Sequence, residues 1–258
     1  MKKDRSICAG IEHCIVLLVL LAMGLAYGCA GLVPKDLKYL VHMDPILPEG
    51  RGDYYVDLDD SSTVFSKEGV LIKVRYLKDV ELNREFPPLF DGRHVNPYTF
   101  EKKPEGKSYI PPRFTTFEVT VINETYSKVQ FDPATAVLYT DGGEEYRYYD
   151  PGREGATILG SNSFNQYYKA ELGISGNEKE LALERMGVIY KTIYHRFRPV
   201  FRGSQRSGFL IFDPLSEDTR GIRLEFNDFV LSFDASDLAE ETVDIEFRFN
   251  VAQSAAAR

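Results

Sequence analysis

The sequence contains few cysteines, no tryptophan and no long hydrophobic run. Its three cysteines are Cys8, Cys14 and Cys29, so the rest of the chain contains no thiol and can form neither a disulfide nor a cysteine-based metal site. The longest apolar run covers residues 15–26. A helix that crosses a bilayer needs about 20 apolar residues, so this run is too short for a membrane span.

Motifs for catalysis are also missing. The sequence has no Gly-x-Ser-x-Gly elbow, and residues 105–108 resemble the end of a phosphate loop except that Glu101 stands where the first glycine is needed. Two acidic turns, 57–60 and 141–145, lack the full spacing of a calcium loop and favour solvated turns. The histidines outside the N-terminal region are not spaced as metal ligands: His42, His94 and His195. We therefore expect a protein that is not an enzyme and has no metal or cofactor.

The short apolar run has the flanks of a secretory signal, with basic residues before it and small residues after it. It ends in Leu25-Ala26-Tyr27-Gly28-Cys29, which resembles the lipobox of bacterial lipoproteins. Gly28 and Cys29 match the family pattern, whereas Ala26 stands where leucine is commoner and Tyr27 where a small residue is usual. In that family the cysteine thiol receives a diacylglyceryl group and the preceding residues are cleaved off.

The resemblance implies a signal peptide at 1–28, lipid attachment at Cys29 and a lipidated tether over 29–52. Ala30 is not an acidic retention signal, so the resemblance also implies export to the outer membrane in a cell that has two membranes. The alternatives for Cys29 are an ordinary buried thiol and a cysteine in an uncleaved anchor. A short helix is possible within the tether, over 35–42.

The charge of the chain is acidic, with a formal net charge of -8. Such a chain repels the phosphates of nucleic acid, so we expect no nucleic-acid partner. Four basic residues nevertheless fall close together: Arg196, Arg198, Arg202 and Arg206. Guanidinium groups suit phosphate or carboxylate partners, which makes this cluster a candidate site for a lipid head group or an acidic envelope polymer. The alternative is charge balance at the end of a helix.

Strand patterns dominate residues 53–251. Apolar and polar residues alternate in 70–76, 117–121, 222–226, 229–233 and 243–251. Alternation with a period of two indicates half-buried strands, and turn signals between them predict an antiparallel β-sandwich. Residues 252–258 are small or polar, and we expect a frayed tail there.

Two stretches interrupt the strand pattern. Residues 177–197 carry apolar side chains at helical spacing and end before Pro199, which predicts one amphipathic helix packed on the sandwich. Residues 83–112 contain six prolines among several aromatic residues, which predicts a long loop. Its aromatic residues favour a loop that packs on its own sheet over one that binds a partner.

The segments Phe117–Asn123 and Gly203–Phe212 resemble strands of the immunoglobulin-like domains of bacterial surface lipoproteins. The similarity covers about 113–251 and implies an immunoglobulin-like sandwich, from which the helix and the proline-rich loop depart. We therefore predict a lipid-anchored cell-envelope protein that acts as a non-catalytic interaction or structural module with an envelope protein or polymer. The alternative is an envelope enzyme or a small-ligand carrier with its site under the 83–112 loop.

Overall fold

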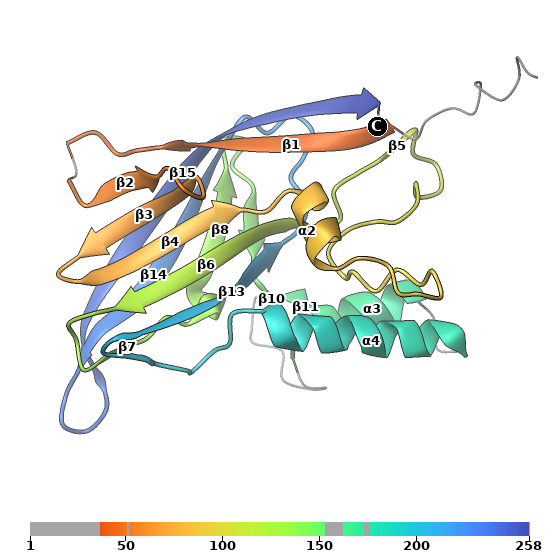
Figure 1. The fold of residues 1–258 in the computed structure, drawn as a ribbon. Helices are drawn as coiled ribbons and strands as arrows, with labels where there is room; N and C mark the ends of the chain where they lie inside the picture. Colours follow the sequence, from red (N-terminus) through yellow and green to blue (C-terminus); the bar gives the residue numbers. More distant parts are fainter. Residues whose placement is uncertain (1–36, 51, 153–161, 173–175, 258) are drawn as a thin grey trace, which may run out of the picture. The chain divides into compact units, whose positions relative to one another are not determined.

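The computed structural model describes residues 37–50, 52–152, 162–172 and 176–257 (Figure 1). The strands are β1 (Leu37–Ile46), β2 (Tyr54–Asp57), β3 (Ser62–Lys67), β4 (Val70–Tyr76), β5 (Tyr109–Ile110), β6 (Thr115–Asn123), β7 (Lys128–Val129), β8 (Ala136–Thr140), β9 (Glu145–Arg147), β10 (Tyr149–Asp150), β11 (Asn162–Ser163), β12 (Val200–Phe201), β13 (Ser204–Phe212), β14 (Gly221–Phe233) and β15 (Ala239–Ala257). The helices are α2 (Asp79–Glu85), α3 (Phe164–Leu172), α4 (Asn177–Thr192) and the 3-10 turn η2 (Pro133–Thr135). The predicted mainly β architecture is confirmed.

Two large sheets contain most of the strands. One has the order β13-β6-β4-β3-β2 and the other the order β5-β1-β15-β14-β8-β9. The pairings of β13, β6, β4, β3 and β2 with one another are all antiparallel, as are those of β15, β14, β8 and β9. The short pairs β1–β5 and β10–β11 are parallel. The prediction of antiparallel sheets is therefore confirmed for the main strands.

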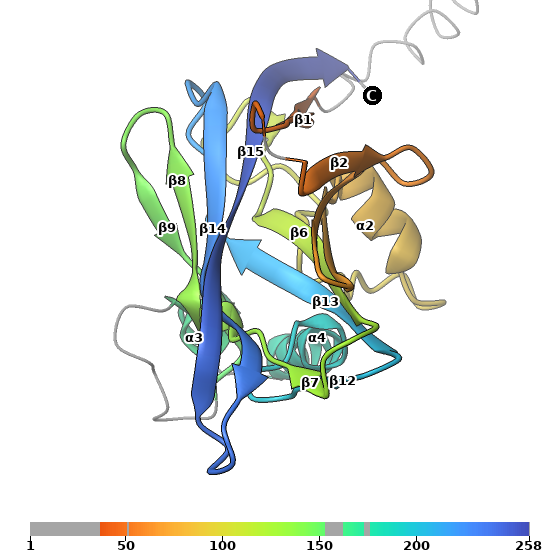
Figure 2. The same ribbon diagram turned by 90° about the vertical axis from the view of Figure 1, so that its left-hand side faces the viewer.

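The core lies between the two sheets, which face each other in Figure 2. In the five-stranded sheet, Ile72 lies opposite Val121 in the register, and both side chains are fully buried. Aromatic rings bridge the sheets: the centroids of Phe117 (β6) and Phe249 (β15) are 5.7 Å apart. Alternating apolar residues thus turn one face of each strand inward, as the sequence predicts.

Strand β14 runs through a site where the sequence suggests a turn. Its register against β15 shifts between Phe226 and Phe229, and Asp228 adopts a positive φ of 55°. The backbone N–H of Asp228 donates to Asp244 Oδ1 over 3.0 Å. The pair Asn227-Asp228 therefore forms a bulge within one long strand, since both flanking segments still pair with β15.

The predicted tether and tail are wrong where the structure describes them. Leu37–Ile46 is a strand between β5 and β15, so the tether does not extend to residue 52, and the described part of the predicted 35–42 helix, residues 37–42, is not helical. Pairing with β15 outweighs local propensity, and Pro45 is tolerated because β5 pairs only with Leu37 and Lys38. Strand β15 continues to Ala257, so residues 252–257 are not frayed.

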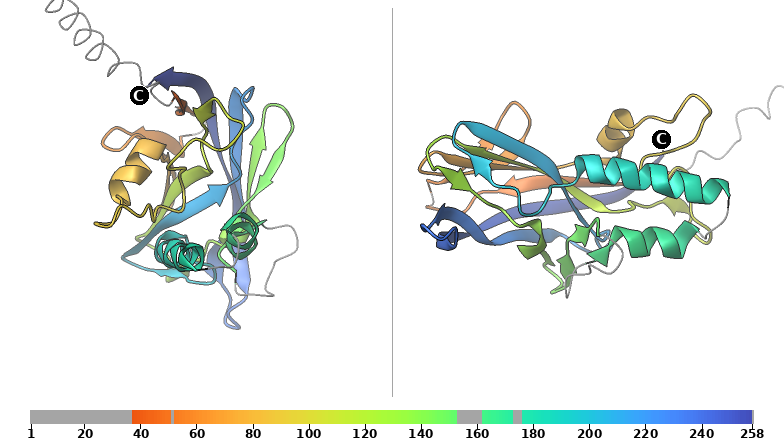
Figure 3. Two further views of the ribbon diagram at one scale, coloured as in Figure 1. Left: turned by 90° about the vertical axis from the view of Figure 1, so that its right-hand side faces the viewer. Right: turned by 90° about the horizontal axis from the view of Figure 1, so that it is seen from below.

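The predicted helix is present as α4 but ends at Thr192 instead of residue 197. The chain then pairs with β13, where the backbone N–H of Tyr194 donates to Phe209 O over 3.0 Å. Gly208 permits this approach, because a Cβ there would lie 2.5 Å from Tyr194 Cα. The helical stripe is only partly buried: Ile189 is fully enclosed, whereas Leu183 is 63% exposed. Figure 3 shows α4 beside the shorter α3.

The 83–112 loop packs on its own sheet, as expected, and it also contacts α4, which was not predicted. Tyr98 is fully buried, its ring centroid lies 5.6 Å from that of Phe209 (β13), and its hydroxyl hydrogen-bonds to Thr192. The backbone oxygen of His94 accepts a 2.8 Å hydrogen bond from Arg185 of α4. The stretch is not a loop throughout, because α2 covers residues 83–85 and β5 covers 109–110.

Candidate functional site

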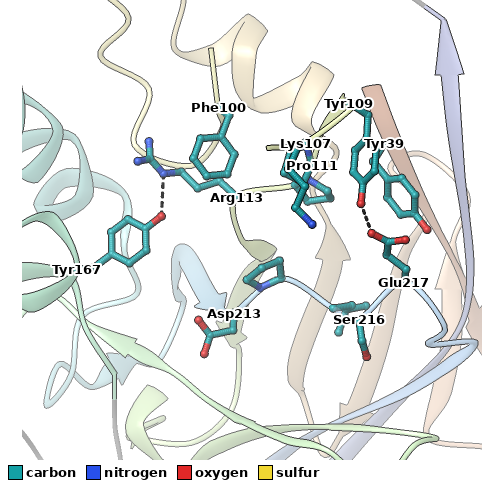
Figure 4. A pocket seen from close by; sticks show the side chains of 13 residues that line it. Tyr39, Phe100, Lys107, Tyr109, Pro111, Arg113, Tyr167, Asp213, Ser216 and Glu217 are labelled. Atoms are coloured by element: carbon teal, nitrogen blue, oxygen red, sulfur yellow. Dashed lines mark hydrogen bonds between the residues drawn. The ribbon is translucent and has the colours of Figure 1, made fainter. Parts of the chain in front are cut away.

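A cavity of about 380 Å³ opens where the 83–112 loop meets β1 and the chain that follows β13 (Figure 4). Its lining combines aromatic rings, prolines and a few charged groups: Tyr39, Phe100, Lys107, Tyr109, Pro111, Pro112, Arg113, Tyr167, Asp213, Pro214, Leu215, Ser216 and Glu217. Mostly apolar walls with a few polar groups are typical of small-ligand sites.

One wall is formed by two tyrosines from adjacent strands. The register places Leu37 of β1 opposite Tyr109 of β5, and the rings of Tyr39 and Tyr109 lie 5.0 Å apart. The hydroxyl of Tyr109 donates to a carboxylate oxygen of Glu217, and this bond raises the pKa of Tyr109 to about 12. The ammonium group of Lys107 lies 5.7 Å from the centroid of the Tyr109 ring.

The opposite wall is formed around Arg113, which lies two residues before β6 and is only 5% exposed. Its guanidinium carbon lies 4.7 Å from the ring centroid of Phe100 and 5.4 Å from those of Tyr167 and Tyr168. Arg113 Nε also donates to the Tyr167 hydroxyl over 3.2 Å. A planar cation among aromatic faces is a stable arrangement that lysine would not reproduce.

Asp213 lies below these walls at the end of β13 (Figure 4). One carboxylate oxygen accepts from the Tyr149 hydroxyl over 2.7 Å, and the other accepts from Asn162 Nδ2 over 2.9 Å. Glu217 is likewise engaged by Tyr109. Both carboxylates are therefore held in fixed orientations by neighbouring side chains, which suits the recognition of a ligand.

The sequence did not identify these residues as a site. They come from β1, the loop, α3 and the segment after β13, so no local spacing connects them. The available signals were prolines at strand boundaries, in Pro111-Pro112 before β6 and in Asp213-Pro214 after β13. The cavity does, however, lie under the C-terminal part of the loop for which a ligand site was the alternative prediction.

The predicted arginine cluster is divided by the fold. Arg196 donates to both oxygens of Asp132, with Nε–Oδ1 and Nη2–Oδ2 distances of 2.7 Å, and its Nη1 lies 3.6 Å from Asp150 Oδ2. Burial lowers the pKa of Arg196, but the hydrogen bonds and charge of Asp132 outweigh it and the pKa is raised. Arg196 is thus engaged within the protein, which leaves three arginines for an external anion.

Two of the remaining arginines, Arg198 and Arg202, are exposed, and Arg206 is half-buried on β13. Arg206 Nε is buried and makes no hydrogen bond with the described residues. Burial lowers the pKa of the nearby His195, and the positive charges of Arg198 and Arg206 lower it further. The cluster therefore retains a positive local potential after Arg196 is excluded.

Cys29 and the proposed signal peptide lie outside the described residues. Within the part of the chain that is described, no helix is both long and apolar enough to cross a bilayer. The same residues contain no group of three or more histidine, cysteine or acidic side chains placed to hold a metal ion. One acidic turn already binds a lysine: Lys73 Nζ lies 2.7 Å from Asp57 and 2.8 Å from Asp60.

Comparison with known proteins gives no family for this chain. No protein-family model matches it, and no curated protein matches it. Among solved structures, it is similar to the yjhA protein from Bacillus subtilis, with 12% sequence identity and a TM-score of 0.33. That alignment covers 71% of this chain and 93% of the other.

Proposed function

We propose that this protein is a lipid-anchored binding protein of the cell envelope, built on an immunoglobulin-like β-sandwich. It holds a small ligand in the cavity beneath the 83–112 loop without transforming it. The cavity carries the proposal, because its apolar walls converge on a few fixed polar groups. The aromatic pair Tyr39 and Tyr109 offers flat surfaces for stacking, and Lys107 offers a cation beside them.

The anchor is the second part of the proposal and is supported by the lipobox resemblance at Cys29. The substitution Cys29→Ser removes the thiol to which the lipid would be attached, the only one in the lipobox-like motif 25–29. The expected result is an unprocessed precursor with no attached lipid, measured by mass spectrometry of the membrane fraction. Normal cleavage and acylation of this variant would contradict the anchor.

Ligand binding can be followed with a single fluorophore, because the chain contains no tryptophan. Tyr39→Trp places an indole in the cavity wall, and Tyr55→Trp places one at an exposed position of β2 as a matched control. Titration with soluble glycan and peptide fragments of the envelope should give a saturable change only for Tyr39→Trp, and Tyr109→Ala should abolish it. Absence of any saturable, cavity-dependent change would reject the cavity as a binding site.

An envelope enzyme is the second candidate, because two carboxylates, Asp213 and Glu217, line one cavity. Glycoside hydrolysis uses such a pair on opposite sides of the scissile bond. Recovery of the bound fragment after incubation distinguishes the candidates. An intact fragment supports binding alone, whereas cleavage that Asp213→Asn abolishes supports the enzyme.

A further inference from the structure

The segment 197–202 exposes two aromatic rings and two cations at one end of the domain. Phe197 is 66% exposed and Phe201 is 57% exposed, and both Arg198 and Arg202 lie on the surface. Neither arginine forms an ion pair with a carboxylate of the described residues. We call these four side chains the 197–202 patch.

The backbone of the patch is held in an unfavourable conformation. Phe197 has a positive φ of 53°, which a bulky residue rarely adopts. Its ring is covered on one side by the Arg196 guanidinium, 4.4 Å from the ring centroid, and Asp132 fixes that guanidinium. Strain that neighbouring contacts maintain at an exposed aromatic residue points to a binding role more than to folding.

The patch is also rigidly mounted. Val200 and Phe201 form β12, which pairs with β7. Asn123 Nδ2 donates to Val200 O over 2.9 Å, and the backbone N–H of Arg202 donates to Ser127 O over 3.2 Å. A surface ordered before binding loses less conformational entropy when it meets its partner.

The patch lies at the end of the domain opposite to Leu37. Strand β13 starts at Ser204, next to the patch, and ends at Phe212, next to the cavity, so its length separates the two by about 27 Å. The start of β1 is at the cavity end, where Leu37 pairs with Tyr109 (Figure 1). Cys29 precedes Leu37 by eight residues, a span of at most about 29 Å. A lipid on Cys29 is therefore connected to the domain through Leu37, at the end that contains the cavity, and the patch lies at the opposite end.

We propose that the 197–202 patch docks onto the head-group layer of a second bilayer that carries anionic phospholipids. This inference rests on the proposed lipid anchor. Arginines pair with lipid phosphates, and the two exposed phenyl rings can enter the apolar boundary of the head-group layer. The net charge of -8 on the whole chain repels such a surface elsewhere, so the basic end is the one that approaches.

A vesicle-tethering experiment tests this with the processed, lipidated protein. The protein is reconstituted into phosphatidylcholine donor vesicles and mixed with acceptor vesicles of phosphatidylcholine alone or with phosphatidylglycerol. Energy transfer between labelled donors and acceptors measures tethering. Tethering is expected only with phosphatidylglycerol acceptors and should weaken as salt is raised.

Variants identify the surface responsible. Arg198→Glu with Arg202→Glu should lower the apparent affinity for acceptors by about 25-fold or more, since each basic residue near an anionic surface strengthens binding by about fivefold. Lys102→Glu with Lys103→Glu makes the same charge change at the cavity end and should leave tethering unchanged. Phe197→Gly should weaken tethering while the fold stays at least as stable, because glycine accepts the positive φ.

The outcomes separate the patch from the anchor. Donor vesicles that retain no protein show that the anchor is absent, which is a failure of the proposed function. Retained protein that tethers no acceptor, or tethers equally with the double arginine variant, overturns the docking proposal. Binding to soluble polyglutamate without any tethering also overturns it and assigns the patch to an acidic polymer.

Discussion

At the cavity end of β13, aromatic side chains are enclosed by a covering segment, whereas at the patch end they are open to solvent. Tyr98 of the 83–112 loop is fully buried against Phe209, while Phe197 and Phe201 are more than half exposed. Aromatic residues thus form part of the core at one end of β13 and part of the surface at the other. The difference lies in the thirty-residue loop, which has no counterpart over the patch among the described residues.

The arginines show the same contrast within a few residues. Arg196 donates to Asp132 and is therefore engaged within the protein, whereas Arg198 and Arg202 are exposed on the surface. Neighbours that are distant in the sequence decide which cation remains available. Basic residues that are close in the sequence can therefore have different surroundings in the folded protein, and only the structure shows which of them are exposed.

The largest effect on stability is expected at Gly208, in the middle of β13, the strand that connects the two ends. A side chain there meets the backbone of Tyr194, so we expect Gly208→Ala to lower the free energy of unfolding by about 2–4 kcal/mol. Gly187→Ala is the matched control, because it faces open space on α4 and should raise that free energy by about 0.5–1 kcal/mol. Denaturant titration measures both. Equal effects of the two substitutions would show that the close approach is unimportant.

The next largest effect concerns Asp132 at the patch end. Asp132→Ala removes both hydrogen bonds of Arg196 and the bond from the Ala134 backbone N–H, so the free energy of unfolding should fall by about 2–3 kcal/mol. The double variant Asp132→Ala with Arg196→Met should recover part of this loss, because no partly buried guanidinium is left without its hydrogen bonds to Asp132. A strictly additive double variant would argue against the pair.

The free energy of unfolding is expected to depend on pH because of Asp79, at the cavity end. Burial raises the pKa of Asp79 from 3.8 to about 7, so the folded state holds a proton that the unfolded state releases between these values. Stability should therefore fall as pH rises from about 4 to about 7. Asp79→Asn should remove that loss, making the variant more stable than the parent by about 1–2 kcal/mol at pH 8 after allowance for partial exposure. Parallel stability curves for the two proteins would contradict the assignment.

The smallest effect is predicted for the exposed arginines. Arg198→Glu with Arg202→Glu should change the free energy of unfolding by no more than about 0.5 kcal/mol, because neither side chain has a described carboxylate partner. Thermal unfolding of the variant used for vesicle tethering measures this directly. A large destabilisation would mean that these arginines support the fold rather than a partner.

Local patterns predicted most of the sheet strands, because each buries alternate residues against the opposite sheet. They failed where pairing over long sequence distances decides the structure. β1 lacks a clear alternation and contains Pro45, and its strand form depends on β15 and β5. The end of α4 depends in the same way on β13 and on a glycine sixteen residues further along.

The candidate site was less predictable than the fold. Tyr39 and Glu217 meet in one cavity although most of the sequence separates them. The arginine cluster was visible as composition, but nothing in the sequence indicates that Asp132 accepts hydrogen bonds from Arg196. A ligand site under the proline-rich loop was predicted only as an alternative, because the aromatic residues there also serve the core.

The position of β1 has a mechanical consequence for a tethered protein. Any pull on the chain before Leu37 is delivered first to a strand that lies between β5 and β15. Ladder hydrogen bonds run across the strand, so a force along β1 loads them together instead of one after another. If the proposed anchor holds the chain, we expect a ten-residue strand placed this way to resist extraction and to shield the cavity beside it from that tension.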